Sequence, residues 1–288
     1  MKSIIYLNKK PWLFAFLISL TWAISNILAV IALSLILHLG NYTLVPPQWA
    51  ALLSYILTIF VVAPFVLGFP GKEHNFSDYL SEIRLTKMQP LLGLILLGLS
   101  CYLLMALSQA AGVLVYRLTQ GLPVDGTFIR SSFVLSNELP PHSASWLISL
   151  PSIFEEVLWR GVILAVFLRI YDQPKAILYT ALCFGLWHIS TLLYGNPVLT
   201  AGNIVWAAIL GLFYGYITLR TRSLLPAIMV HYLGNLFVSA INVYIQAKAS
   251  NLSVAVYGVV FTFGIIPTIL MLLWTRFFTA RWSIIQKP

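Results

Sequence analysis

Residues 151–160 read Pro-Ser-Ile-Phe-Glu-Glu-Val-Leu-Trp-Arg and lie inside an apolar segment that runs from about residue 144 to residue 168. Two adjacent carboxylates and a guanidinium therefore fall where a membrane-spanning helix should have its centre. Each charged side chain at such a position costs about 3 kcal/mol on insertion scales. A chain that places three of them there needs partners for them, and we expect other apolar segments to supply those partners.

The composition is that of a polytopic membrane protein. Hydrophobic residues make up 60% of the 288 residues and charged residues only 9%, whereas soluble domains carry about 25% charged residues. The net charge of +9 does not indicate nucleic-acid binding, because the basic residues are scattered at segment ends and form no basic run with interleaved aromatics. Cys101 and Cys183 lie in apolar segments and have no metal-ligand spacing.

The apolar pattern predicts an all-α fold of about eight transmembrane helices in one bundle, with residues 1–288 forming a single membrane domain. Spans of about 20 residues match the ~30 Å hydrocarbon core. The expected spans are 11–39, 48–69, 90–116, 144–168, 174–193, 201–219, 224–246 and 254–278. The polar connector 70–89 has apolar residues near helical spacing, which fits an amphipathic interfacial helix and a solvated linker about equally well.

The basic residues predict the orientation. Thirteen of the Lys and Arg residues fall at the chain ends and in connectors that the predicted alternation puts on one side, whereas only Arg117, Arg130 and Lys248 fall on the other. The positive-inside rule then places both termini in the cytoplasm. We expect an integral membrane protein, in the plasma membrane if the source is bacterial.

The polar residues of the fourth span have different expected roles. Glu156 and Arg160 are four residues apart and share a helix face, which favours an ion pair that orients the helix. Glu155 points about 100° away and is left without a cation on its own helix face. An intramembrane carboxylate of this kind is a functional candidate, and the alternative is a buried polar tie.

Two further motifs carry polar residues into later spans. Residues 184–188 read Phe-Gly-Leu-Trp-His, and residues 231–235 read His-Tyr-Leu-Gly-Asn. A lone histidine in an apolar helix is more often a packed residue than a catalytic one. Here, counted from the predicted cytoplasmic ends, Glu155, His188 and Asn235 each lie roughly 20 Å deep, and His231 lies somewhat shallower. We expect them to meet in one water-containing cavity.

The sixth span contains Gly211-Leu-Phe-Tyr-Gly215. Small residues four apart on a membrane helix allow a neighbouring helix to approach closely. The motif therefore predicts tight helix packing and no chemistry.

Together, the three polar motifs resemble the CAAX protease and bacteriocin-processing family (CPBP, also called Abi), which includes the type II CAAX prenyl endopeptidases. The family pattern is Glu-Glu-x-x-x-Arg, then Phe-x-x-x-His, then His-x-x-x-Asn on successive membrane helices. Residues 155–160, 184–188 and 231–235 match it in order and spacing. The resemblance covers roughly residues 145–240 as a catalytic core, and the first three spans carry no family signature.

The resemblance implies peptide-bond hydrolysis within the membrane. It implies that Glu155 and His188 activate a water, that His231 and Asn235 hold the oxyanion, and that Glu156, Arg160 and Phe184 support them. A carboxylate in a dry site is a usable base, and fixed donors there stabilise developing negative charge. Glu155, His188 and His231 could instead bind Zn²⁺, but the chain has no His-Glu-x-x-His motif, so we favour a metal-independent mechanism with no certain cofactor.

Two other classes of function stay open. Intramembrane Glu and His also form proton relays in transporters, although we find no internal repeat. A non-catalytic immunity or scaffold protein could have kept the fold, although a scaffold has no need of all six polar residues. The expected partners are membrane lipid and a membrane-associated protein or peptide substrate, and the sequence does not say whether that substrate is prenylated.

Overall fold

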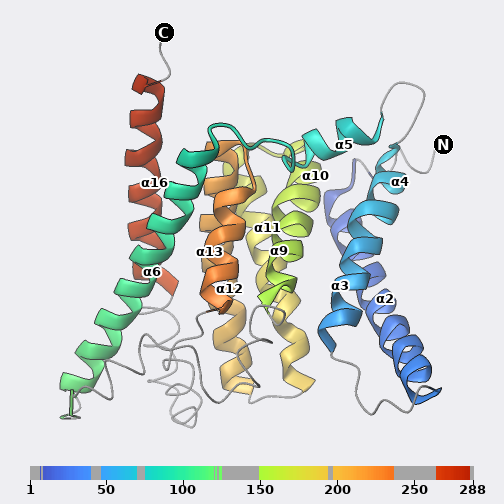
Figure 1. The fold of residues 1–288 in the computed structure, drawn as a ribbon, viewed down its shortest axis with the longest axis horizontal. Helices are drawn as coiled ribbons and strands as arrows, with labels where there is room; N and C mark the ends of the chain where they lie inside the picture. Colours follow the sequence, from blue (N-terminus) through green and yellow to red (C-terminus); the bar gives the residue numbers. More distant parts are fainter. Residues whose placement is uncertain are drawn as a thin grey trace.

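The structure is a computed structural model of the chain. It describes residues 7, 9–39, 47–69, 75–119, 121, 123–124, 149–193, 197–236 and 264–285. Within these ranges the protein is helical and contains no β-strand. The helices run side by side as a bundle, with α2 and α3 at one edge and α6 and α16 at the other (Figure 1).

The described helices follow the expected spans in order. They are α2 (Pro11–Leu39), α3 (Pro47–Leu57), η1 (Thr58–Val62), α4 (Ala63–Leu67), α5 (Phe76–Glu82), α6 (Leu91–Thr119), α9 (Pro151–Glu156), η3 (Val157–Ile163), α10 (Leu164–Leu168), α11 (Gln173–Trp187), η4 (His188–Leu193), α12 (Pro197–Thr221), α13 (Leu225–Leu236) and α16 (Ile266–Ile285). The segments η1 and η3 are π-helical and η4 is a 3₁₀-helix.

Four described segments are long and apolar enough to cross a membrane. They are Pro11–Ile36, Trp49–Leu67, Leu91–Gly112 and Thr200–Thr221. The all-helical membrane fold is thus confirmed, whereas the count of about eight spans is not. The seventh and eighth expected spans lie partly outside the described residues, and α16 continues beyond the expected end at 278 to Ile285.

One continuous helix, made of α9, η3 and α10, lies at the centre of the bundle (Figure 1). Pro151 occupies its first turn, where the missing N–H is no loss. Every residue from 156 to 167 is buried. The helix widens to π geometry at Val157, directly after the two glutamates, and such π segments occur frequently at functional sites.

A short helix, α5, lies across one end of the bundle within the 70–89 connector (Figure 1). Asn75 and Asp78 form a reciprocal capping box that starts it. Tyr79 is fully buried and its hydroxyl donates to the Ile59 carbonyl at 2.5 Å, while Glu82 pairs with Arg169. The connector is therefore helical in part and packed onto the core. Its contact with a membrane surface remains a prediction.

Glycines let α11 and α12 approach closely. A Cβ on Gly211 would lie 3.0 Å from the Ala181 Cα, and one on Gly185 would lie 2.6 Å from the Ile204 carbonyl oxygen. A Cβ on Gly215 would meet the Ile177 side chain at 3.1 Å. The close packing predicted from the Gly211 and Gly215 motif is confirmed.

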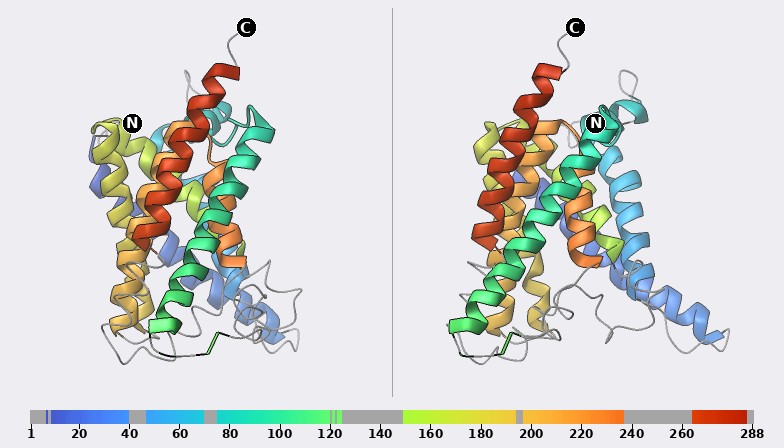
Figure 2. Two further views of the ribbon diagram at one scale, coloured as in Figure 1. Left: turned by 90° about the vertical axis from the view of Figure 1, so that its left-hand side faces the viewer. Right: turned by 60° about the vertical axis from the view of Figure 1, so that its left-hand side comes forward.

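Helix α2 begins and α16 ends at the same end of the bundle, the end that carries α5 (Figures 1 and 2). The predicted cytoplasmic residues Arg169 and Arg220 also lie at helix ends there. This arrangement agrees with an even number of membrane crossings, counted from α2 to α16 with both helices included. The cytoplasmic assignment of that end remains a prediction.

Candidate functional site

Glu156 is the centre of a buried polar cluster. Arg160 Nη1 donates to Glu156 Oε1 at 3.0 Å, and the two side chains are 2% and 0% exposed. His231 Nδ1, from α13, lies 2.7 Å from the same oxygen. The ion pair expected from the four-residue spacing is confirmed, and it has a third member from another helix. Because a carboxylate paired with arginine accepts, Nδ1 of His231 is the donor.

Aromatic rings enclose the guanidinium of Arg160. Its Cζ lies 4.1 Å from the ring centroid of Phe184 on α11 and 5.1 Å from that of Tyr214 on α12. Cation–π contacts gain strength when they are desolvated, so the rings offset part of the cost of burying the charge. Gly211 leaves room for this, because a Cβ there would lie 3.1 Å from Arg160 Nη2.

Glu155 faces a different set of groups from Glu156. The Tyr55 hydroxyl, from α3, donates to Glu155 Oε1 at 3.3 Å, and Glu155 Oε2 lies 3.8 Å from His231 Nε2. The side chain is 18% exposed. The two carboxylates thus flank one imidazole, with Glu156 held in an ion pair and Glu155 held more loosely.

His188 lies where α11 ends and η4 begins. Its Nδ1 is 2.9 Å from the Phe184 carbonyl oxygen. A carbonyl oxygen only accepts, so Nδ1 carries the hydrogen and Nε2 of the neutral ring is the acceptor. Phe184 stands between the two histidines, with its ring centroid 5.0 Å from that of His188 and 6.0 Å from that of His231.

Asn235 is the predicted site residue for which the described contacts include none to the other predicted site residues. It lies on α13 one turn beyond His231, and its side chain is exposed. It is also next to Leu236, where α13 ends. Its place in a common cavity therefore remains a prediction. The contacts described above join the central helix, α11 and α13 through six predicted residues: Glu155, Glu156, Arg160, Phe184, His188 and His231.

The zinc alternative needs three converging ligands. Within the described ranges no group of three His, Cys, Asp or Glu side chains is arranged to hold a metal ion. His231 Nδ1 is already directed at Glu156, and His188 Nδ1 at a main-chain carbonyl. In this arrangement the side chains of Glu155, His188 and His231 do not converge as zinc ligands. The choice between a glutamate mechanism and a metal mechanism remains a prediction.

The motifs that carry these contacts lie within one segment of the chain. Residues 140–237 match the family model Rce1-like, type II CAAX prenyl endopeptidase Rce1-like. The resemblance to type II CAAX prenyl endopeptidases is thus confirmed over this Rce1-like segment, and the wider CPBP and Abi names remain predictions. No curated protein and no solved structure matches the chain.

Two contacting residues were missed by the sequence reasoning. The Tyr214 ring stacks on His231, with centroids 5.3 Å apart and planes at 16°, and it lies inside the Gly211 to Gly215 motif that we interpreted as packing alone. Tyr55 lies outside the Rce1-like segment. A tyrosine in an apolar span was the only signal for either residue, and it does not indicate which helix the hydroxyl faces.

Proposed function

We propose that the protein is an intramembrane endopeptidase of the CAAX type, which hydrolyses a peptide bond of a membrane-associated protein or peptide. The observation that carries the proposal is the pair of adjacent carboxylates flanking His231. Glu156 is paired with Arg160, whereas Glu155 faces the Tyr55 hydroxyl and His231. The Rce1-like match over the same helices supports a protease of this class.

In the proposed reaction Glu155 is the general base. It takes a proton from a water whose oxygen bonds to the substrate carbonyl carbon, and the neutral Nε2 of His188 accepts a hydrogen bond from that water. The carbon–nitrogen bond then breaks as the proton passes from Glu155 to the departing amine. Water is consumed and no other reactant is needed. General acid–base catalysis of this kind contributes about 10²–10⁴-fold.

The carbonyl oxygen gains negative charge during the attack, and we assign its stabilisation to His231 and Asn235. Glu156 and Tyr214 fix the His231 ring from its edge and its face. A His231 ring that carries a hydrogen on both nitrogens is positively charged. Its charge and that of Arg160 then offset the two negative charges of Glu155 and Glu156. Pre-oriented donors in a water-poor site stabilise an oxyanion most effectively.

The test is cleavage by the purified protein in liposomes. The substrates are a peptide with a farnesylated Cys-aliphatic-aliphatic-X terminus, the same peptide without the farnesyl group, and an unrelated peptide library, with products identified by mass spectrometry. We expect cleavage by the wild type and by Asp172→Asn, an exposed carboxylate outside the site, but not by Glu155→Gln. No cleavage of any substrate would contradict the proposal, and proton flux without cleavage would favour a transporter.

A further inference from the structure

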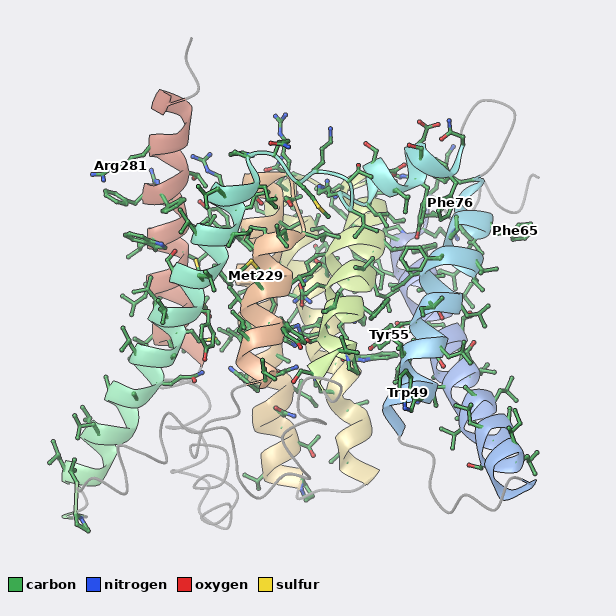
Figure 3. All side chains as sticks on the ribbon, in the orientation of Figure 1. Trp49, Tyr55, Phe65, Phe76, Met229 and Arg281 are labelled. Atoms are coloured by element: carbon green, nitrogen blue, oxygen red, sulfur yellow. The ribbon has the colours of Figure 1, made fainter. Side chains whose placement is uncertain are left out.

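Tyr55 reaches the site from a helix that the Rce1-like match does not cover. It lies on the side of α3 that faces α9 (Figure 3). Its side chain is 1% exposed, and its hydroxyl donates to Glu155 Oε1 at 3.3 Å. A hydroxyl buried in an apolar bundle needs a partner, and Glu155 supplies one.

The Tyr55 ring is held on two sides. The centroid of the Trp22 ring, from α2, lies 5.0 Å from that of the Tyr55 ring. The ring of Phe154, the residue before Glu155, stacks on Tyr55 with centroids 6.3 Å apart. The Trp22 ring in turn packs against the Trp187 ring of α11, with centroids 4.5 Å apart. Aromatic packing from three helices therefore fixes the direction of the hydroxyl, so that it acts as a rigid donor rather than a mobile one.

This donor makes the two oxygens of Glu155 unequal. Oε1 faces Tyr55, whereas Oε2 faces His231 at 3.8 Å. A glutamate side chain has three rotatable bonds, and a base that samples several rotamers is rarely in position for proton transfer. The 3.3 Å distance is longer than the usual 2.7–2.8 Å for such a bond, and catalytic hydrogen bonds in substrate-free enzymes commonly tighten when substrate binds.

We propose that Tyr55 is a positioning residue for Glu155: its hydroxyl holds Oε1 and thereby presents Oε2 to the water and to His231. This inference rests on the proposed function for its catalytic consequence and adds a residue from the N-terminal half of the chain to the site. It also assigns a role to α3, which pairs with α2 at the edge of the bundle and packs on α9.

The first test is kinetic. Tyr55→Phe keeps the packed ring and removes only the hydroxyl, so we expect kcat to fall roughly tenfold to a hundredfold with KM unchanged. Tyr79→Phe is the matched control, since Tyr79 is equally buried and its hydroxyl is also hydrogen-bonded, to the Ile59 carbonyl. The control should lose thermal stability and keep kcat. Unchanged kcat in Tyr55→Phe, or equal losses in both variants, would overturn the positioning role.

The second test needs no activity. A double-mutant cycle of Tyr55→Phe with Glu155→Met, read as shifts in the thermal unfolding midpoint, should be non-additive, because residues in contact couple. The same cycle with Tyr79→Phe should be additive. An additive Tyr55 cycle would overturn the Tyr55–Glu155 contact itself. A wild type that cleaves nothing but shows this coupling would overturn the proposed function while leaving the contact supported.

Discussion

Helix α2 and the helix formed by α9, η3 and α10 are both strongly apolar, yet their surroundings are opposite. Most of α2 is open to its surroundings, with Phe16 62%, Leu28 59% and Ile36 63% exposed, as suits a span that meets lipid. Every residue from 156 to 167 is buried by other parts of the protein. The sequence pattern predicted a span for both helices and did not indicate which of the two would be buried.

Charge does separate them. Helix α2 contains no Asp, Glu, Lys or Arg, whereas the central helix carries Glu155, Glu156 and Arg160 at the point where α3, α11 and α13 can partner them. A charged side chain within a membrane is tolerated where neighbouring helices supply polar or charged partners for it. Intramembrane charges therefore mark the helix that the bundle packs around.

The largest expected effect comes from removing one partner of the buried ion pair. Arg160→Ala leaves Glu156 buried without its cation, which costs roughly 3–5 kcal/mol, so the thermal unfolding midpoint in detergent should drop sharply. Arg169→Ala breaks the exposed pair with Glu82 and should cost about 0.2–1 kcal/mol. An Arg160→Ala protein that is inactive but as stable as wild type would move Arg160 from the supporting group to the reacting one.

An intermediate effect is expected from the same substitution in each of the two helices. Leu164 is fully buried, so Leu164→Ala leaves a cavity and should cost about 2–5 kcal/mol. Leu28→Ala on α2 leaves no cavity, since lipid fills the space, and should stay within about 0.5 kcal/mol. The unfolding midpoints of the two variants measure the contrast directly. Equal losses would show that α2 is covered in the native protein.

A smaller effect is expected at the close approach between α11 and α12. Gly185→Ala places a Cβ 2.6 Å from a main-chain oxygen, and overpacking of this kind costs typically 1–3 kcal/mol. The atoms nearest to a Cβ at Gly215 belong to the Ile177 side chain, which can move, so Gly215→Ala should cost less. Thermal unfolding of both variants ranks them, and the reverse order would show that the backbone yields more easily than the side chain.

Much of the fold could be predicted from the sequence because hydropathy and turn residues determine where membrane helices begin and end. The starts of α2, α6 and α11 follow this pattern to within one residue. The predicted count of about eight crossings is not confirmed, because the expected seventh and eighth spans extend beyond the described residues. The π segment η3 also has no sequence signature, since it depends on how residues 156–167 pack against their neighbours.

The site was predictable to the extent that its contacts are local. The Phe184 ring lies against both His188 and His231, while the shared cavity of Glu155, His188, His231 and Asn235 remains a prediction. Four-residue spacing predicted the Glu156–Arg160 pair, and the counted depth predicted that polar groups of the fourth, fifth and seventh spans would meet. It did not predict that His231 would contact both carboxylates, because that contact depends on how α13 packs on α9. Tyr55 was missed for the same reason, being separated from Glu155 by 100 residues.

The central claim is that Glu155 activates water while Glu156 holds the structure. The measurement that tests it most directly is the kcat of Glu155→Gln on whichever peptide the wild type cleaves, measured on protein with a wild-type unfolding midpoint. The account predicts a loss of at least about 10²-fold, with substrate binding retained. A Glu155→Gln enzyme that turns over near the wild-type rate would contradict it.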